Sequence, residues 1–349
     1  SVEYYGTIFA IAESLSEAGV IWTGSDDGRV NVSRDHGKTW QDVTPSGRKN
    51  GLPLEIQINS IEAHPFEPGG LYLAATAYKS DDFAPYLFKT TDYGEHWTKI
   101  TSGIAADHFT RVIRADRQQQ GLLFAGTEFG LYMSKDDGQH WQSAQFNLPI
   151  VPITDLALKQ GNLIAATQGR GYWILDDVAV LRQTSEAVLG KAQHLFIPDP
   201  VWRLRNGASE TPENMGTNPP AGVALYYWLA EDLEAGTELS LAIKDHNGDT
   251  IRTFSPKPAA DVKDEKSQLG DDDRKLETTA GLNRFVWDLR YPSAEKFKGL
   301  VLWNSSLKGI RAIPGAYQAT LTVGDMQQTA AFEVLADPRL DTPAAEYQE

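Results

Sequence analysis

Three carboxylates occupy turns between predicted β-strands, where their side chains can meet a ligand. They are Asp26, Asp82 and Glu128. Two carboxylates that flank a glycosidic bond can act as general acid and as base or nucleophile, and their separation sets the stereochemistry of hydrolysis. Asp-Gly and Glu-x-Gly are also ordinary turn sequences. The three residues are therefore catalytic candidates with a purely structural alternative.

Further polar side chains on these turns, on a connection between repeat units and at the start of a strand favour ligand binding. They combine acidic, basic and imidazole groups, which can form ion pairs and hydrogen bonds. The predicted ligand-binding residues are Asp27, Lys79, Asp81, His108, Arg111 and Arg170. Tyr78, Phe83 and Phe129 lie on these turns as well. Their rings either stack on a ligand or pack within the loops.

One motif that occurs three times sets the elements that position these turns. Residues 33–40, 90–97 and 134–141 share the pattern [ST]-x-D-x-G-x-x-W. Each copy ends one β-rich run and precedes another, so it predicts a hairpin turn. The hydroxyl and carboxylate can accept backbone N–H bonds, and the glycine can supply a positive φ. We predict structural roles for Asp35, Trp40, Asp92, Trp97, Asp136 and Trp141, with each tryptophan mostly buried against its own hairpin.

The motif resembles the Asp-box, or BNR repeat, of sialidases, sortilin-type receptors, xyloglucan-degrading glycosidases and photosystem II assembly factors. The chain as a whole resembles the C-terminal part of bacterial Asp-box proteins described as sortilin-like or glycosyl-hydrolase-like. Trp22–Gly28, Gly169–Asp177 and Asn283–Tyr291 carry this likeness. The resemblance implies a β-propeller whose Asp-boxes are structural and lie opposite the ligand-binding face.

A self-similar unit of about 40–50 residues is typical of solenoids and propellers. We predict an all-β fold in which residues 1–184 form four blades, as part of a larger propeller; a closed four-bladed ring is the alternative. The predicted strands are 7–12, 20–24, 29–33 and 39–43; 56–63, 71–76, 86–91 and 97–100; 110–115, 122–126, 130–134 and 141–144; and 153–158, 163–167, 171–175 and 178–182. The fourth unit lacks the Asp-box.

The second half of the chain changes character. Short strand-like runs at this spacing predict an antiparallel β-sandwich over residues 190–337, followed by a tail over 338–349. Pro314–Tyr317 resembles the Pro-Gly-x-Tyr of immunoglobulin-like and fibronectin-like modules, in which the tyrosine makes a corner hydrogen bond. Gly281–Asp288 resembles a segment of the immunoglobulin-like module of the flagellar hook-capping protein. Long loops are expected at 206–220 and 256–276, and Asp271–Asp273 in the second lacks the spacing of a calcium loop.

The composition of the chain argues against several classes of function and of binding site. The net charge of −15 argues against nucleic-acid binding, which needs a basic surface. The chain has no cysteine, and no apolar run is long enough for a membrane span. No dinucleotide, phosphate-loop or metal-binding motif occurs, so we predict neither a cofactor nor a metal.

Together these features favour a non-catalytic binding module that presents a propeller loop face to a glycan or protein. The resemblance places it outside the cytoplasm, in the periplasm or secreted from a bacterium. The alternative is an Asp-box glycoside hydrolase with part of its site on missing upstream blades. Because an incomplete propeller exposes apolar faces, upstream blades or a homodimer mate are the expected partners.

Overall fold

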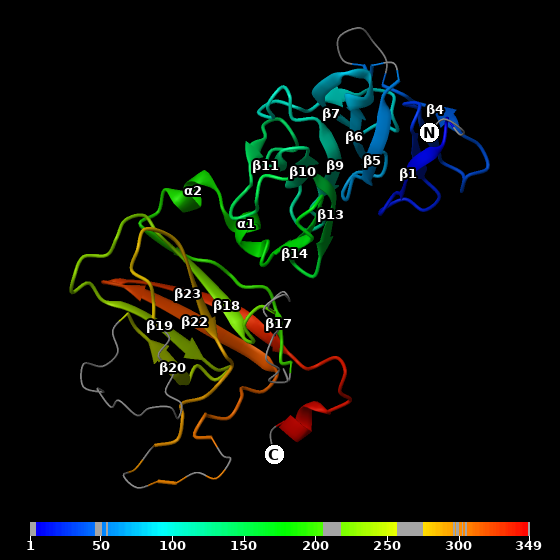
Figure 1. The fold of residues 1–349 in the computed structure, drawn as a ribbon. Helices are drawn as coiled ribbons and strands as arrows, with labels where there is room; N and C mark the ends of the chain where they lie inside the picture. Colours follow the sequence, from blue (N-terminus) through cyan, green and yellow to red (C-terminus); the bar gives the residue numbers. More distant parts are fainter. Residues whose placement is uncertain are drawn as a thin grey trace. The chain divides into compact units, whose positions relative to one another are not determined.

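The computed structural model describes residues 5–45, 51–53, 55–204, 218–256, 275–295, 297, 300–301, 303 and 306–347 of the 349-residue chain. Asp271–Asp273 lie outside these ranges. Nearly all of the regular structure is antiparallel β-sheet, which confirms the predicted all-β class (Figure 1). None of the described helices is both long and apolar enough to cross a membrane. The chain divides into two compact units, Ser1–Asp176 and Asp177–Glu349.

The first unit is a succession of four antiparallel sheets, each with its strands in chain order. Sheet 1 contains β1 (Ile8–Glu13), β2 (Ile21–Ser25), β3 (Val30–Ser33) and β4 (Gln41–Asp42), and sheet 2 contains β5 (Gln57–Ala63), β6 (Leu71–Ala77), β7 (Asp82–Thr90) and β8 (Thr98–Lys99). Sheet 3 contains β9 (Thr110–Ala115), β10 (Leu123–Thr127), β11 (Gly130–Ser134) and β12 (Gln142–Ser143), and sheet 4 contains β13 (Ile153–Lys159), β14 (Asn162–Thr167) and β15 (Tyr172–Leu175).

Two predicted elements differ from the structure. The strand predicted at 178–182 is the helix α1 (Ala179–Gln183), which belongs to the second unit. The sequence has no Asp-box here to reverse the chain, and the N–H groups of Val180 and Arg182 bond instead to the carbonyls of Asp177 and Val178. The strand predicted at 86–91 begins earlier in the structure, because β7 starts at Asp82. Only a short turn therefore separates β6 from β7 in sheet 2.

The three repeated motifs form hairpin turns with the same hydrogen bonds. In the first, the Ser33 hydroxyl donates to Asp35 at 2.9 Å and accepts the N–H of Gly37 at 2.8 Å, while Asp35 accepts the N–H of Thr39 at 2.9 Å. The turns at Asp92 and Asp136 repeat this set. Both the glycine and the residue before it adopt positive φ in each copy, as His36 and Gly37 show at 62° and 81°. The expected turn chemistry is therefore present.

Apolar side chains fill the space between successive sheets. One core cluster joins sheets 1 and 2 and includes Trp22, Leu73 and Phe88. A second joins sheets 2 and 3 and includes Leu87 and Leu123. Each of these thin sheets thus buries its faces against its neighbours, which fixes the stacking order.

Trp97 and Trp141 pack against the preceding sheet and Trp40 is exposed, so the expectation that each is mostly buried against its own hairpin was wrong. The Trp141 indole is 4% exposed and donates to the carbonyl of Ile100 in sheet 2 at 2.7 Å. Trp97 is half-buried and donates to Val43 in sheet 1 at 2.8 Å. Trp40 is 45% exposed and donates only to Gly37 of its own turn, at 3.1 Å. The indole is buried only where a preceding sheet provides a wall.

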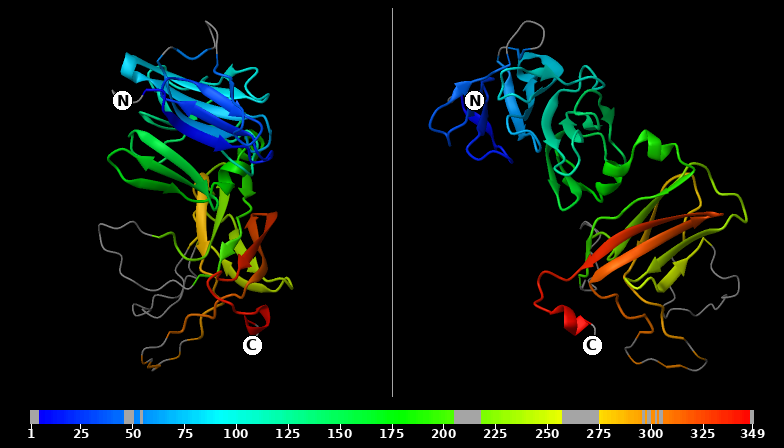
Figure 2. Two further views of the ribbon diagram at one scale, coloured as in Figure 1. Left: turned by 90° about the vertical axis from the view of Figure 1, so that its right-hand side faces the viewer. Right: turned by 180° about the vertical axis from the view of Figure 1, so that it is seen from behind.

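The first and fourth sheets do not pack on each other in the described part of the chain, and the four sheets follow an open arc (Figure 2). The register makes Ile11 equivalent to Ile61, Ile113 and Leu156. Ile11 is 69% exposed, whereas its counterparts are at most 5% exposed. A closed four-sheet ring, which would have buried Ile11, is therefore not what this unit forms.

The second unit contains two sheets around one core. Its strands are β16 (Gln193–Leu195), β17 (Val201–Trp202), β18 (Val223–Leu229), β19 (Leu239–Lys244), β20 (Thr250–Phe254), β21 (Gly281–Trp287), β22 (Gly315–Val323) and β23 (Met326–Leu335). One sheet has the order β16-β18-β21 and the other β17-β23-β22-β19-β20. Trp287 from the first and Phe332 from the second meet in the core, and the Tyr317 hydroxyl donates to the carbonyl of Ile313 at 2.7 Å. That bond is the expected tyrosine corner; the immunoglobulin-like assignment remains a prediction.

Removing the buried indole should destabilise the first unit far more than removing the exposed one. We expect Trp141→Ala to lower the free energy of unfolding by about 3–5 kcal/mol, as for a core aromatic. The matched variant Trp40→Ala should cost about 1 kcal/mol or less, because this side chain has no neighbouring sheet. Urea denaturation monitored by circular dichroism measures both; equal losses would contradict the role of the preceding sheet.

Acid should weaken the hairpins. Backbone and side-chain hydrogen bonds from Thr39 lower the pKa of Asp35 to about 2. Burial alone would raise the pKa of Asp92 and Asp136, but hydrogen bonds from His96 and His140 lower it. A carboxyl with a lowered folded-state pKa stabilises the fold above its unfolded pKa of about 4, and this contribution is lost as the pH falls through the folded value.

We therefore expect the melting temperature to fall steeply between about pH 4 and pH 2. Asp35→Asn should reduce that dependence because it removes one of the titrating groups. Asp81→Asn, at an exposed turn outside the hairpins, is the control for the loss of one surface carboxylate. An Asp35→Asn profile that parallels the wild type would contradict the argument.

Candidate functional site

The predicted site residues of sheet 1 hold the chain in place. The Asp26 carboxylate accepts the backbone N–H groups of Gly6 and Thr7, both at 2.8 Å. Asp27 accepts the hydroxyl of Ser25 and lies 3.6 Å from the guanidinium of Arg29. Asp26 therefore ties the β2–β3 turn to the residues before β1, and Asp27 closes the turn itself.

The acidic residues after β6 are also engaged. One Asp82 oxygen accepts the N–H of Ala84 at 3.0 Å, and the other accepts the hydroxyl of Tyr86 at 2.6 Å. Burial, and then this hydrogen bond, raise the pKa of Tyr86 to about 12. Asp81 adopts a φ of 61° in the turn that ends the 3-10 helix Tyr78–Ser80. The exposed Lys79 ammonium donates to Gln57 at 2.9 Å.

An ion pair between sheet 3 residues forms the centre of the candidate site. The Arg111 guanidinium contacts one Glu128 oxygen through Nε at 2.8 Å and through a terminal nitrogen at 2.7 Å. Both side chains are about one-quarter exposed, at 22% and 26%. The guanidinium also lies 5.1 Å from the centre of the Phe109 ring and 5.7 Å from that of Tyr78. Glu128 is thus paired with a cation that lies close to two aromatic rings.

Aromatic rings extend this cluster on both sides. Tyr78 stacks on Phe109 at 5.1 Å, and Phe83 approaches the same ring at 6.1 Å. His108 stacks on Phe129 at 4.8 Å. Phe109 is buried, while the Tyr78, Phe83 and Phe129 rings are 37%, 46% and 45% exposed. The rings therefore both pack among themselves and remain accessible.

We use the term loop face for Tyr78, Phe83, His108, Arg111, Glu128 and Phe129. The structure brings these residues together from the β6–β7 and β10–β11 turns, from the start of β7, and from the residues at and just before the start of β9. Sequence reasoning did not include Phe109 and Tyr132, which support the group: Phe109 carries Tyr78, and the Tyr132 hydroxyl lies 2.8 Å from His108 Nδ1. Nothing in the sequence around these two residues indicated that they would support the group.

Arg170 does not join this group among the described contacts. It lies in the exposed turn between β14 and β15, where its carbonyl accepts the Trp173 indole N–H at 3.1 Å. No described hydrogen bond or ion pair links its side chain to Arg111 or Glu128. Asp26 and Asp27 are likewise engaged within sheet 1.

One further group has metal-ligand chemistry. Atoms of Asp92, Glu95 and His96 that could bind a metal lie within 4.8 Å of one another. Asp92 already accepts the hydroxyl of Thr90, the N–H of His96 and the His96 imidazole. The sequence did not predict this group, and its contacts are those of the hairpin turn.

The geometry above is that of a propeller-type unit, and comparison with known proteins gives the same class. Residues 28–151 match the family model of sortilin, neurotensin receptor 3. This match includes all three Asp-box hairpins, and the chain is similar to sortilin over that stretch. A search of the curated proteins found no match.

Similar solved structures are distant. YCF48 bound to D1 peptide has 20% sequence identity and a TM-score of 0.37, and the match covers 50% of this chain and 53% of that one. YCF48 from Cyanidioschyzon merolae has 15% identity, a TM-score of 0.37, and coverage of 51% and 55%. The GH74 enzyme of Niastella koreensis has 15% identity, a TM-score of 0.35, and coverage of 63% and 27%. The chain thus spans about half the length of the YCF48 proteins and a quarter of the enzyme.

Proposed function

We propose that the first unit is a non-catalytic binding module that presents its loop face to a glycan or a protein. The observation that carries the proposal is that the candidate catalytic carboxylates already have partners. Asp26 holds two backbone N–H groups, Asp82 holds Tyr86 and Ala84, and Glu128 is paired with Arg111. A glycosidase needs one carboxyl to protonate the leaving group and a second to attack or to activate water. These contacts support binding over the hydrolase alternative.

The loop face has the composition of a recognition surface. Tyr78, Phe83 and Phe129 expose apolar ring surface, and Arg111 and Glu128 provide donors and acceptors between them. Aromatic side chains and arginine are the residues that most often dominate binding energy. The rings are held by Phe109 and His108, so little side-chain freedom would be lost on binding.

The proposed location is outside the cytoplasm, in the periplasm or secreted. The Asp-box resemblance and the sortilin match over residues 28–151 support it. The binding role and the location are separate proposals, because neither requires the other.

Truncating the exposed rings should weaken ligand binding without unfolding the protein. We expect the double variant Tyr78→Ala/Phe129→Ala to lose affinity by about tenfold or more, since buried aromatic anchors carry much of the binding energy. A glycan array and affinity capture from an extracellular protein fraction identify the ligand class, and calorimetry with the ligand found gives the affinity. Phe66→Ala, an exposed ring on the β5–β6 turn, is the matched control.

Hydrolysis is the outcome that would overturn this function. Release of reducing ends from a glycan by the wild-type chain, with loss in both Asp82→Asn and Glu128→Gln, would show that these carboxylates are catalytic. Unchanged affinity in the double ring variant would instead move the binding surface away from the loop face.

We further propose that upstream blades or a homodimer mate covers the outer face of sheet 1. Ile11 and Trp40 are exposed there, although their counterparts in later sheets are buried or half-buried. If a homodimer mate covers this face, sedimentation velocity should show a concentration-dependent dimer, and Ile11→Arg should shift it to monomer. Ile310→Arg, at a 75% exposed position in the second unit, is the control. A chain that stays monomeric at all concentrations would contradict the homodimer and favour upstream blades.

A further inference from the structure

Sheet 4 lacks the outer strand that its three sister sheets possess. It ends at β15, whereas β4, β8 and β12 form the fourth strand of sheets 1, 2 and 3. The side chains of Tyr172 and Ile174 on β15 are 80% and 59% exposed. Their register counterparts in sheet 3, Leu131 and Met133, are each 4% exposed. These exposures show that the face of sheet 4 directed away from sheet 3 is uncovered, and no strand in the described part of the chain pairs with the outer edge of β15.

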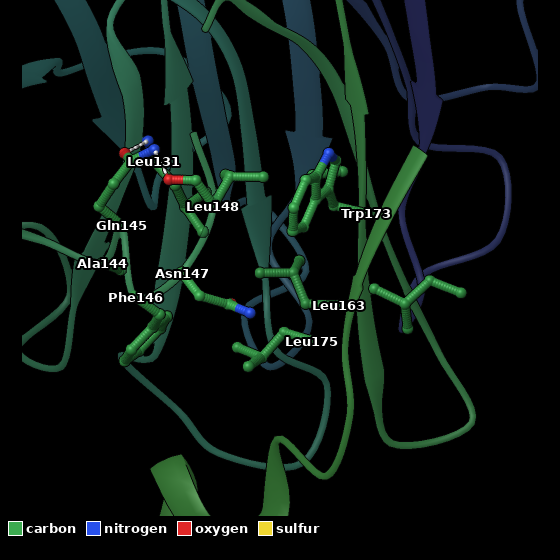
Figure 3. Close-up of a pocket in the computed structure, with 11 residues that line it drawn as sticks. Leu131, Ala144, Gln145, Phe146, Asn147, Leu148, Leu163, Trp173 and Leu175 are labelled. Atoms are coloured by element: carbon green, nitrogen blue, oxygen red, sulfur yellow. Dashed lines mark hydrogen bonds between the residues drawn. The ribbon is translucent and has the colours of Figure 1, made fainter. Parts of the chain in front are cut away.

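A cleft lies beside this edge, between sheets 3 and 4 (Figure 3). Its empty volume is about 370 Å³, including space open to solvent. Leu131 and Ala144 form one wall, and Leu163, Trp173 and Leu175 form the other. The lining is mainly apolar, so a hydrophobic side chain would gain by entering it.

The cleft corresponds to the place that Trp141 occupies between sheets 2 and 3. Five residues that cluster with Trp141 have their register counterparts in the lining of the cleft. The pairs are Leu87 with Leu131, Ile100 with Ala144, Leu123 with Leu163, Ala125 with Ala165, and Tyr132 with Trp173. The walls of the slot are thus repeated.

Sheet 4 has no motif tryptophan equivalent to Trp141. In the other sheets the tryptophan comes from the hairpin that leads into the fourth strand, and here helix α1 follows instead. The indole N–H bonds to the carbonyl of Val43 or Ile100, and Ala144 is the equivalent residue of sheet 3. Each of these three residues donates its own N–H to the strand beside it in the same way, Ala144 to Leu131 at 2.9 Å.

We propose that this cleft and the edge of β15 form a docking site for an extended segment of a partner protein that carries a tryptophan. The segment adds to β15 as a fourth strand, and its indole fills the cleft. Strand addition of this kind takes affinity from main-chain hydrogen bonds and specificity from side-chain pockets. The site lies apart from the loop face and does not depend on the proposed function.

The sister sheets predict the register of the bound segment. Val43, Ile100 and Ala144 each lie three residues after their tryptophan and donate to Val30, Leu87 and Leu131. The counterpart of these acceptors in sheet 4 is Tyr172. The residue three positions after the docked tryptophan should therefore donate its N–H to the Tyr172 carbonyl. An aliphatic side chain suits that position, as the sister sheets show.

A synthetic peptide with the sequence of Gly94–Thr101 tests the proposal, because it contains Trp97 and strand β8. Fluorescence anisotropy of the labelled peptide with the full chain should show saturable binding. The same peptide with alanine in place of Trp97 should bind about tenfold more weakly or worse, since the indole is the anchor.

Three variants locate the site. Ala144→Trp should abolish peptide binding because it fills the cleft. Ile174→Pro should also abolish it, since proline removes an edge donor, while the matched Ile174→Ala should retain binding because it keeps the N–H. Thermal melting of each variant shows whether it is folded.

No binding of the Gly94–Thr101 peptide to the folded wild-type chain up to millimolar concentration would overturn the proposal. Binding that is unaffected by a folded Ala144→Trp variant would overturn it as well. Loss of the loop-face ligand in Tyr78→Ala/Phe129→Ala with intact peptide binding would show that the two sites are separate.

Discussion

The burial of apolar faces between neighbouring sheets is the constraint on which the first unit depends. A sheet of three or four short strands has two apolar faces and cannot cover either by itself. Residues such as Leu73 and Leu87 lie on successive strands of sheet 2 and belong to different cores, one toward sheet 1 and one toward sheet 3. The stability of each sheet therefore belongs to the pair that shares a core, and the two outermost faces are left with nothing to cover them in the described structure.

The Asp-box hairpins combine a local and a non-local part. The bonds from Ser33, Asp35 and Gly37 close the turn within a few residues, so they form in every copy. The tryptophan works between sheets, which is why Trp141 is buried and Trp40 is exposed although their motifs are the same. The motif glycine has a related role: a Cβ at Gly94 or Gly138 would lie 2.6 or 2.7 Å from Val43 or Ile100 of the preceding sheet. The same short motif thus closes a hairpin turn and packs its sheet against the preceding sheet.

The groups available for binding in the first unit are those that do not already stabilise the fold. Some charged side chains that a ligand could recruit already stabilise turns, as Asp26 and Asp82 show. The exposed rings of the loop face and the open edge of β15 remain available. The first suits a ligand with flat or polar groups, and the second suits an extended chain.

The sequence by itself determined the all-β class, the hairpins and most strands, because these follow from contacts between residues close in the chain. Alternation of apolar residues and the [ST]-x-D-x-G-x-x-W spacing located β3, β7 and β11 to within a few residues. The sequence did not predict helix α1, because Val178–Arg182 is as apolar as a strand. Only the absence of a turn that would reverse the chain decided its conformation. The choice of Arg111 as partner for Glu128, the support of Tyr78 by Phe109 and the exposure of Trp40 were decided by tertiary structure. Each depends on distances between residues far apart in sequence, which spacing along one chain does not encode.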